Sequence, residues 1–368
     1  MKIGILTLPP STNYGGILQA YALQTILERR GHNVCLIEKQ RKYSLPLWKM
    51  PLSYGKRMLK NLLGDTFPVL YEQKMKREIP IIRQNTDIFI NKYIKRRIVE
   101  NLSDISEDDF DAIIVGSDQI WRPKYLYYPI AHAYLDFTKG WNIIRIAYAA
   151  SFGTDKWEYT YRQTKRCSCL LKKFDAVSVR EKSGIDLCRE YFDVESVHVL
   201  DPTMLLPIED YINLFKVINT LESKGSLLYC ILDETPEKFA LINKIAEEKH
   251  LKPFSVNSRV ENLSAPLDER IQPPVEQWLR GFYDAEFVIT DSFHACVFSI
   301  LFNKPFIVIG NEKRGMSRFI SLLEMFGLEN RLLIDTFENN SFNEINWQKV
   351  NVILNDKRMD SSKIFNKL

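Results

Sequence analysis

One histidine occupies a position where a parallel α/β fold places catalytic groups. His294 belongs to the stretch DAEFVITDSFHACVFSILFNKPFIVIG, residues 284–310. The pattern predicts a strand over 286–290, a turn in which Asp291 and Ser292 are available as helix caps, and a helix with His294 in its first turn. Loops that leave the carboxyl ends of strands bind ligands, and a helix N-terminus favours an anion. His294 is therefore a candidate to contact an anionic ligand, and packing or capping of its own helix is the competing interpretation.

A second group of chemically useful residues follows the predicted strand over 111–115. The strand DAIIV runs directly into GSDQIWRP, which supplies Ser117, Asp118, Gln119 and Trp121. Carboxylates accept protons, amides bond hydroxyl groups and indole rings stack on sugars. The composition favours a sugar-binding site, with a structural turn as the alternative.

Two later strands also end in charged residues. Arg180 follows a predicted strand over 175–179, and Asp201 follows one over 197–200. Because the carboxyl ends of parallel strands share one edge of a sheet, we expect these residues near Asp118. The loop after the first strand reaches the same edge, and its candidate substrate-binding residues are Asn13, Gly15 and Gly16.

Three cations follow the stretch that contains His294. They lie in a loop and helix start just after a strand, and they are Lys313, Arg314 and Arg318. Such cations can hold an anion across a cleft between domains, or they can form a solvated helix face.

Alternating strands and helices predict an α/β protein with two domains. The predicted first domain covers 1–205, with a basic and helical insertion over about 39–100. The second covers 206–342, and a helical tail over 343–368 is expected to cross back to the first domain.

Composition narrows the class of protein. The 368 residues are 45% hydrophobic and 26% charged, and the net charge is +4. This is typical of a soluble protein, and the charge is too small and dispersed to predict nucleic-acid binding. The pair Cys167 and Cys169 lacks the partners of a zinc set, so we expect no metal site, no cofactor and free thiols in a reducing compartment. MKIGILTLPP predicts a strand rather than a signal peptide, and no apolar run has the length of a membrane span, so a cytoplasmic location is expected.

The segment from Lys39 to Gly64 is basic and amphipathic. It has no acidic residue, and apolar side chains alternate with seven basic residues: Lys39, Arg41, Lys42, Lys49, Lys56, Arg57 and Lys60. A segment of this kind can lie on an anionic membrane surface, which would make the protein peripheral at the inner face of the membrane. An insertion packed on the domain with a solvated basic rim is the alternative.

Several motifs together resemble the polysaccharide pyruvyl transferase family. They are NYGGILQAYALQ, VGSDQIW, YAASFG, SVRE, LDPT and DSFHACVFSILFNKPFIV, and they occur in the family's order over about residues 2–328. The resemblance implies two Rossmann-like domains that face a cleft, similar to GT-B glycosyltransferases. It also implies transfer of the enolpyruvyl unit of phosphoenolpyruvate onto two hydroxyls of a sugar, with release of phosphate.

The resemblance also implies roles for particular residues. His294 would be the general acid, or at least contact phosphoenolpyruvate, and Arg180 would bind the anionic groups of that donor. Many members carry an arginine two positions before the histidine, where this chain has Ser292. Arg314, Arg318 or Lys313 would then supply the missing charge. Asp118 is the first candidate for the base that activates the sugar hydroxyl, with Trp121 as a stacking platform.

Two other functions fit the same pattern. A GT-B fold serves a glycosyltransferase that uses a nucleotide sugar equally well, and a relative without catalysis would bind sugars or anions only. For a pyruvyl transferase the acceptor is expected to be a capsular or exopolysaccharide repeat unit. The basic segment suits an acceptor attached to a lipid.

Overall fold

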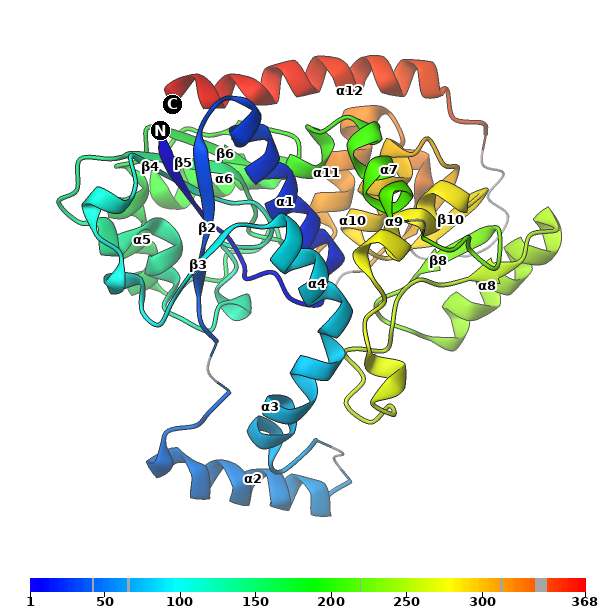
Figure 1. Cartoon of the computed structure of the whole chain (residues 1–368), viewed down its shortest axis with the longest axis horizontal. Helices are drawn as coiled ribbons and strands as arrows, with labels where there is room; N and C mark the ends of the chain where they lie inside the picture. Colours follow the sequence, from blue (N-terminus) through cyan, green and yellow to red (C-terminus); the bar gives the residue numbers. More distant parts are fainter. Residues whose placement is uncertain (42, 65–66, 219, 312–313, 335–342) are drawn as a thin grey trace.

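Two parallel sheets form the body of the protein. The computed structural model describes residues 1–41, 43–64, 67–218, 220–311, 314–334 and 343–368. Helices lie against each sheet, so the molecule consists of two α/β domains side by side (Figure 1). This confirms the α/β class with two parallel-sheet domains that the sequence predicts.

The first sheet has seven strands in the order β3-β2-β1-β4-β5-β6-β7, and every neighbouring pair is parallel. Because the order reverses between β1 and β4, loops that leave these two strands diverge and open a crevice at their carboxyl ends. The strands are β1 (Lys2–Leu6), β2 (Asn33–Lys39), β3 (Arg96–Val99), β4 (Ala112–Val115), β5 (Ile144–Ala150), β6 (Ala176–Val179) and β7 (Val197–His198).

The second sheet has five parallel strands in the order β12-β11-β10-β8-β9, and its order reverses between β8 and β10. Its crevice therefore lies beside the helix that carries His294. The strands are β8 (Leu227–Cys230), β9 (Pro253–Phe254), β10 (Phe287–Thr290), β11 (Phe306–Ile309) and β12 (Leu332–Leu333).

Twelve α-helices occur among the described residues, beside several short 3-10 turns. They are α1 (Tyr14–Arg29), α2 (Met50–Leu62), α3 (Tyr71–Ile82), α4 (Gln84–Tyr93), α5 (Tyr161–Leu171), α6 (Lys182–Leu187), α7 (Ile208–Val217), α8 (Pro236–Lys249), α9 (Val275–Asp284), α10 (Phe293–Leu301), α11 (Ser317–Phe326) and α12 (Trp347–Ser362).

The two domains share one continuous apolar core. A single cluster of buried side chains extends from β1 through α1 and α10 to β10. Tyr14 of α1 stacks on Trp278 of α9 with ring centroids 5.2 Å apart. Loops of the two domains also meet at Gly315, where a Cβ atom would lie 1.8 Å from the carbonyl oxygen of Gly153. Gly315 has a φ of +96°, so glycine is required there for conformation and for space.

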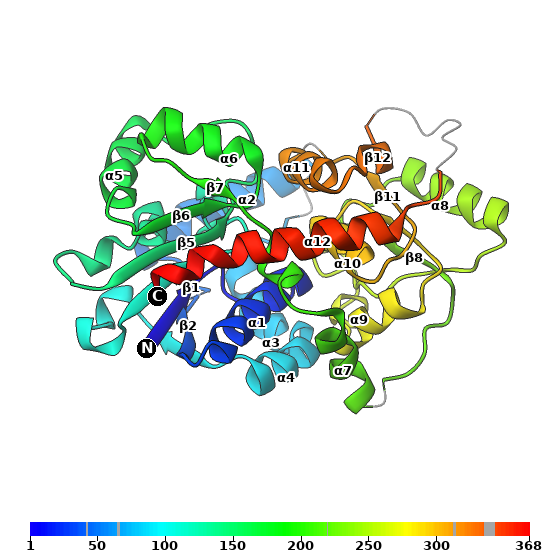
Figure 2. The same ribbon diagram turned by 90° about the horizontal axis from the view of Figure 1, so that it is seen from above.

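The last helix joins the two domains a second time. Helix α12 starts beside the second domain and runs along the molecule until the chain ends near the N-terminus (Figures 1 and 2). Phe365 stacks on Tyr148 of β5 at 4.8 Å between centroids, and the Ser361 hydroxyl accepts the Leu200 N–H at 2.9 Å. Arg358 donates to the carbonyl oxygens of Met204 and Leu206. The helix thus fixes the relative position of the domains.

Helices α2 and α3 project from the body as an arm, defined here as residues 47–64 and 67–82 (Figure 1). The insertion predicted over 39–100 extends too far, because α4 and β3 belong to the first domain. Phe89 and Ile90 of α4 are buried in its core, and β3 pairs with β2. Within the described residues, no helix has both the length and the apolar character needed to cross a membrane.

Candidate active site between the two sheets

Charged side chains from several strand ends meet next to His294. Arg180, after β6, donates to Asp201 Oδ2 at 2.9 Å and to Asp118 Oδ1 at 3.1 Å. The hydroxyl of Ser117 donates to Asp201 Oδ2 at 3.1 Å. His294 Nε2 lies 3.5 Å from the same Asp201 oxygen. The structure therefore brings His294 of the second domain next to four residues that the sequence placed at one edge of the first sheet.

This charged cluster is almost completely buried. Burial by itself would raise the pKa of Asp118, but the charges of Arg180, His294 and Arg318 hold it below the ordinary value. For Asp201, burial is likewise outweighed, by His294 and Arg180, so that its pKa is also low. Both carboxyl groups are thus ionised at neutral pH, and each is bound to a cation.

Phe293, the first residue of α10, connects this cluster with a second arginine. The guanidinium carbon of Arg180 lies 4.6 Å from the centroid of the Phe293 ring, and that of Arg318 lies 5.3 Å from it. Burial lowers the pKa of Arg318 to about 10, and the neighbouring Arg180 contributes. A nearby anion would stabilise the charged form of an arginine that is buried in this way.

Two helix N-termini, one from each domain, meet at His294. A Cβ atom on Gly15, in the first turn of α1, would lie 1.9 Å from His294 Nδ1. Only glycine leaves room for the imidazole. The N-cap residue of α1 is Asn13 and that of α10 is Ser292, and neither side chain makes a capping hydrogen bond. The first-turn N–H groups of both helices remain available to an anion.

Asp291 does not cap α10, the helix for which the sequence made it available as a cap. Its carboxylate accepts the backbone N–H groups of Leu232 and Asp233 and pairs with Lys238 Nζ at 2.7 Å. It therefore ties the end of β10 to the end of β8.

A cavity of about 740 Å³ opens in front of these helix ends. It is large enough for a sugar and a small anionic donor. Of the residues proposed from sequence, those in its wall are Asn13, Gly15, Ser292, His294 and Arg314. Arg180, Arg318, Asp118 and Asp201 are not in this wall and are buried next to it.

The wall on the side of the second domain is lined by paired charges. Arg314 donates to both oxygens of Asp233 at 2.8 and 3.1 Å and to Glu261 at 2.7 Å. The bond from Arg314 lowers the pKa of Asp233 to about 2. Arg314 is therefore already neutralised, which leaves it little charge for a ligand.

Several buried polar atoms around the cluster have no hydrogen-bond partner among the described residues. They are Nε of Arg180, Nε of Arg318, Nε2 of His294 and Oε2 of Glu181. Orphaned buried donors are rare in a folded protein. Three N–H donors of this kind beside one pair of helix N-termini favour a site for an anionic ligand.

One family of known proteins has a sequence profile that matches most of the chain. The sequence profile of the polysaccharide pyruvyl transferase family matches residues 13–313, which include the α1 N-terminus, the strand ends and His294. The chain belongs to the polysaccharide pyruvyl transferase family. No curated protein matches the sequence.

This pyruvyl transferase family member has a GT-B-like fold, which a solved structure with a TM-score of 0.50 supports. A protein of Listeria monocytogenes assigned as a UDP-N-acetylglucosamine 2-epimerase is 11% identical, with a TM-score of 0.50 over 99% of this chain and 90% of that one. The UDP-GlcNAc 2-epimerase of Neisseria meningitidis is 10% identical, with a TM-score of 0.48 over 99% and 94%. MurG of Acinetobacter baumannii is 10% identical, with a TM-score of 0.41 over 97% and 94%. At these identities the likeness concerns the fold alone.

The prediction that Trp121 of this family member stacks on a sugar is wrong. Its side chain is 0% exposed, stacks on Tyr134 at 5.0 Å and donates its indole N–H to the Ala133 carbonyl. A ring buried in this way cannot stack on a sugar. Gln119 accepts a bond from Arg122 at 3.0 Å, so it supports the loop rather than lining the cavity.

Two further positions complete the account of the predicted site. Gly16 is buried, and a Cβ atom added there would lie 3.5 Å from the Asn13 side chain. Lys313 lies outside the described residues. Phe293 and Asp233 were not predicted from the sequence, although Phe293 adjoins His294 and Asp233 follows the strand β8.

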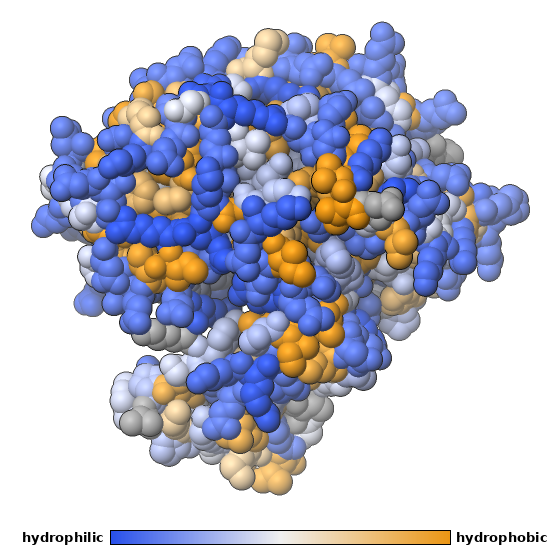
Figure 3. Space-filling model, in the orientation of Figure 1, coloured by the Kyte–Doolittle hydropathy of each residue, from blue (hydrophilic) through white to orange (hydrophobic). Residues whose placement is uncertain are grey.

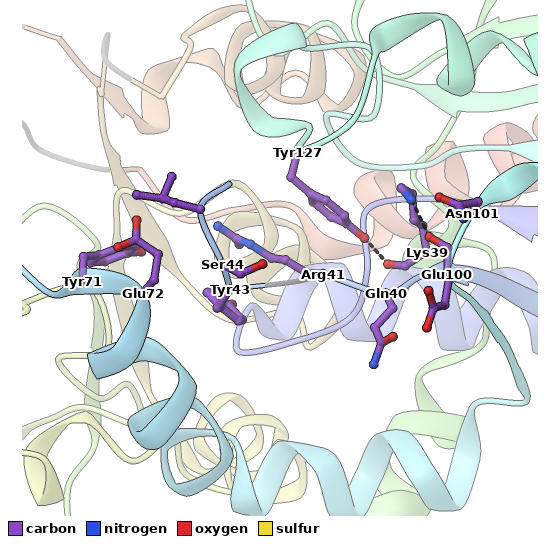
Figure 4. A pocket seen from close by; sticks show the side chains of 11 residues that line it. Lys39, Gln40, Arg41, Tyr43, Ser44, Tyr71, Glu72, Glu100, Asn101 and Tyr127 are labelled. Carbon is purple, nitrogen blue, oxygen red and sulfur yellow. Dashed lines mark hydrogen bonds between the residues drawn. The ribbon is translucent and has the colours of Figure 1, made fainter. Parts of the chain in front are cut away.

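A second cavity, of about 390 Å³, lies where the arm leaves the first domain (Figure 4). The Tyr127 hydroxyl donates to the Lys39 carbonyl, and the Arg41 guanidinium lies over the rings of Tyr43 and Tyr127. Aromatic rings and amides, from Tyr71 and Asn101 among others, face this space.

Proposed function

We propose that the protein transfers the pyruvyl unit of phosphoenolpyruvate onto two hydroxyls of a sugar in a polysaccharide or its lipid-linked precursor. The product is a cyclic pyruvate ketal, and phosphate is released. One observation carries the proposal: His294 lies against Gly15 where two uncapped helix N-termini from the two domains face one cavity. The donor has a carboxylate and a phosphate, and both suit free N–H groups at helix ends.

His294 is the acid in this proposal. It donates a proton to the methylene carbon C3 of the donor, which becomes a methyl group and leaves C2 electron-poor. Asp201, whose Oδ2 lies 3.5 Å from Nε2, orients the ring. The first sugar hydroxyl then bonds to C2 and returns its proton to His294.

Departure of phosphate completes the reaction. The C2–O bond to phosphate breaks, the second hydroxyl bonds to C2, and its proton leaves with the phosphate. This sequence conserves protons without a separate base. Asp118 is bound to Arg180 and has a lowered pKa, which makes it a weak base, so we assign it to positioning Arg180.

Arg318 is the best replacement for the arginine that the family pattern has at position 292. It is buried beside Phe293, as Arg180 is, and its Nε has no partner among the residues that the structure describes. Arg314 is paired with Asp233 and Glu261. Arg180 is paired with Asp118 and Asp201, so its charge is already balanced. We infer that Arg318 raises the local positive potential and that the helix N–H groups contact the donor.

The decisive experiment is incubation of the protein with phosphoenolpyruvate and a panel of galactose, glucose, mannose and N-acetylmannosamine acceptors. We expect phosphate release and a pyruvate-sized mass gain on at least one acceptor. No mass gain on any acceptor contradicts the proposal.

Thermal shift separates the pyruvyl transferase from a glycosyltransferase. A ligand at 100 times its Kd stabilises the folded state by about 2.7 kcal/mol. We expect phosphoenolpyruvate to raise Tm and UDP or GDP sugars to leave it unchanged. The reverse result would favour a glycosyltransferase, and a shift with sugars alone would favour a binding protein without catalysis.

A further inference from the structure

The outer face of the arm presents an apolar stripe to solvent. Helix α2 buries none of its described side chains. Apolar residues of α2 and of its two ends recur at the spacing of one helix face, and five of them are 61–84% exposed: Trp48 just before the helix, Leu52, Leu59 and Leu62 in it, and Leu63 at its C-cap. Apolar side chains are visible on the arm at the bottom of Figure 3. An exposed stripe of this size is typical of a docking surface.

Contacts on the inner face hold the stripe outward. Arg57 donates to both oxygens of Glu72 at 2.8 Å and to the Val69 carbonyl at 3.0 Å. Its guanidinium also lies within 6 Å of the rings of Tyr54 and Tyr71. Because α3 holds the Arg57 face of α2, the helix cannot rotate to bury its leucines without losing these bonds.

Basic groups accompany the stripe. Lys56 and Lys60 flank its leucines and form no ion pair within the described part of the chain, and no acidic residue occurs between Lys39 and Gly64. A cavity of about 360 Å³ lies beside them and is lined by Ser53, Lys56, Arg57, Lys60, Asn61 and Phe67. Its size and lysines suit a phosphate headgroup.

The arm is also connected to the candidate active site. Lys74 of α3 donates to the Leu263 carbonyl at 2.8 Å, and Arg270 pairs with Glu78 of α3 at 2.6 Å. The loop of the second domain that these contacts hold also lines the large cavity, over residues 257–262. The arm therefore positions whatever it binds relative to that cavity.

We propose that the outer face of α2 docks on an anionic lipid bilayer, with the leucines in the interfacial layer and the lysines at phosphate headgroups. The choice of occupant follows from charge. A second copy of the same face would place lysines opposite lysines, whereas an anionic bilayer satisfies both the apolar stripe and the cations. The idea that docking brings the cavity to a lipid-linked acceptor rests on the proposed function; the docking itself does not.

Sedimentation with vesicles tests the apolar stripe. The full chain should pellet with phosphatidylcholine vesicles that contain phosphatidylglycerol and remain in solution with pure phosphatidylcholine. Leu52→Ser, Leu59→Ser and Leu63→Ser together should lower the partition coefficient by more than about tenfold. The matched control replaces Val352 and Met359, exposed on α12 at the opposite end of the molecule, with serine and should retain binding. Equal loss in both variants overturns the proposal.

A double charge reversal tests the contribution of the two lysines to docking. Lys56→Glu with Lys60→Glu should reduce vesicle binding about as strongly, and raised salt should weaken the wild-type protein. Arg162→Glu with Lys165→Glu, exposed on α5, changes the net charge equally and should have much less effect. If both pairs reduce binding equally, the effect is one of net charge and the docking face is wrong.

Trp48 reports insertion directly. Brominated lipids in the anionic vesicles should quench part of the tryptophan fluorescence, and Trp48→Phe should remove that part. Arm variants that shift the protein from dimer to monomer, without wild-type binding to vesicles, would identify a second copy as the occupant and refute the proposal. Phosphate release with a water-soluble acceptor should be unchanged in arm variants, so failure of the pyruvyl transfer proposal and failure of docking are distinguished.

Discussion

The junction around His294 and the outer face of α2 are opposite exceptions to the usual pattern of burial: the first buries charged side chains, and the second exposes apolar ones. At the junction, charged groups such as Arg180, Asp118 and Asp201 are buried and paired. On α2, the leucines are exposed, and so are the lysines that flank them. Stability alone favours neither arrangement, because buried charges and exposed leucines each cost free energy.

The difference concerns what each region contacts. The charged groups of the junction are buried, so a small anion beside them would interact strongly with a few fixed groups. The arm exposes its apolar surface, and the partner proposed for it is a lipid bilayer, which is large and has no fixed shape. A substitution at the junction or on the arm should therefore have a very different effect from a substitution of the same chemical type at a control position.

The largest effect is expected from His294→Ala. Loss of the general acid should lower kcat by about 10²–10⁴-fold in the phosphoenolpyruvate assay. The fold should persist, because Arg180 and Ser117 still donate to the buried Asp201 carboxylate when the imidazole is removed. His32→Ala, remote from the site in sequence and structure, is the control for loss of a histidine. Near-normal turnover of His294→Ala would remove His294 from the mechanism.

Arg180→Met should have the largest effect on stability. Removal of the cation leaves Asp118 and Asp201 buried without their main partner, which costs about 3–5 kcal/mol in urea unfolding. Arg29→Met is the matched control, because Arg29 binds Asp210 through two bonds of 2.7 Å but its side chain is 51% exposed. That pair should contribute about 0–1 kcal/mol. Equal costs for the two variants would contradict the contrast between buried and exposed charge.

The same carboxyl groups predict the response to acid. The folded pKa values of Asp118 and Asp201 are lowered, so their contribution is complete above the unfolded value of about 4 and is lost as the pH falls through the folded values. The wild-type protein should lose stability below about pH 4. Asp118→Asn should show a shallower loss, measured as urea midpoints between pH 2 and pH 6, and an unchanged slope would assign the acid response to other groups.

Local sequence patterns were sufficient to predict most of the fold. The strands predicted over 286–290, 111–115 and 175–179 occur as β10, β4 and β6, each beginning one residue later than predicted, because their apolar runs and flanking polar residues are local signals. The edge strand β3 was not predicted. Its sequence, RRIV, is short and half polar, and its pairing with β2 depends on a distant segment.

The site was predictable as a set of residues but not as a geometry. Parallel-sheet topology brings Asp118, Arg180 and Asp201 to one edge, so their positions in sequence were informative. Nothing local shows that Trp121 turns into the core, or that Arg314 is neutralised by Asp233, because those contacts depend on packing between segments far apart in the chain. The contact between Gly15 and His294 joins two domains and is equally invisible to local patterns.

Gly15→Ala tests a position that has no room for a methyl group, in contrast to the neighbouring Gly16, which has room. The new methyl group would occupy the space of the imidazole, 1.9 Å from Nδ1, and would displace His294. A displacement of about 1 Å lowers kcat by on the order of 10²-fold. Gly16→Ala is the control, since its methyl group would lie 3.5 Å from the Asn13 side chain, at ordinary contact distance. Equal activity of the two variants would show that the imidazole does not act from this position.

The smallest effect is expected on the arm. Leu59→Ala should change the free energy of unfolding by less than about 0.5 kcal/mol, because Leu59 is exposed and loses little buried surface on truncation. Leu279→Ala, in the core between the domains, should cost about 2–5 kcal/mol through lost burial and a cavity. Urea unfolding of the two variants measures the difference directly. A cost above 1 kcal/mol for Leu59→Ala would mean that the free chain in solution already covers the stripe, by its own residues or by a second copy. The arm would then contribute to stability as the junction does, and its apolar face would not be available to a membrane.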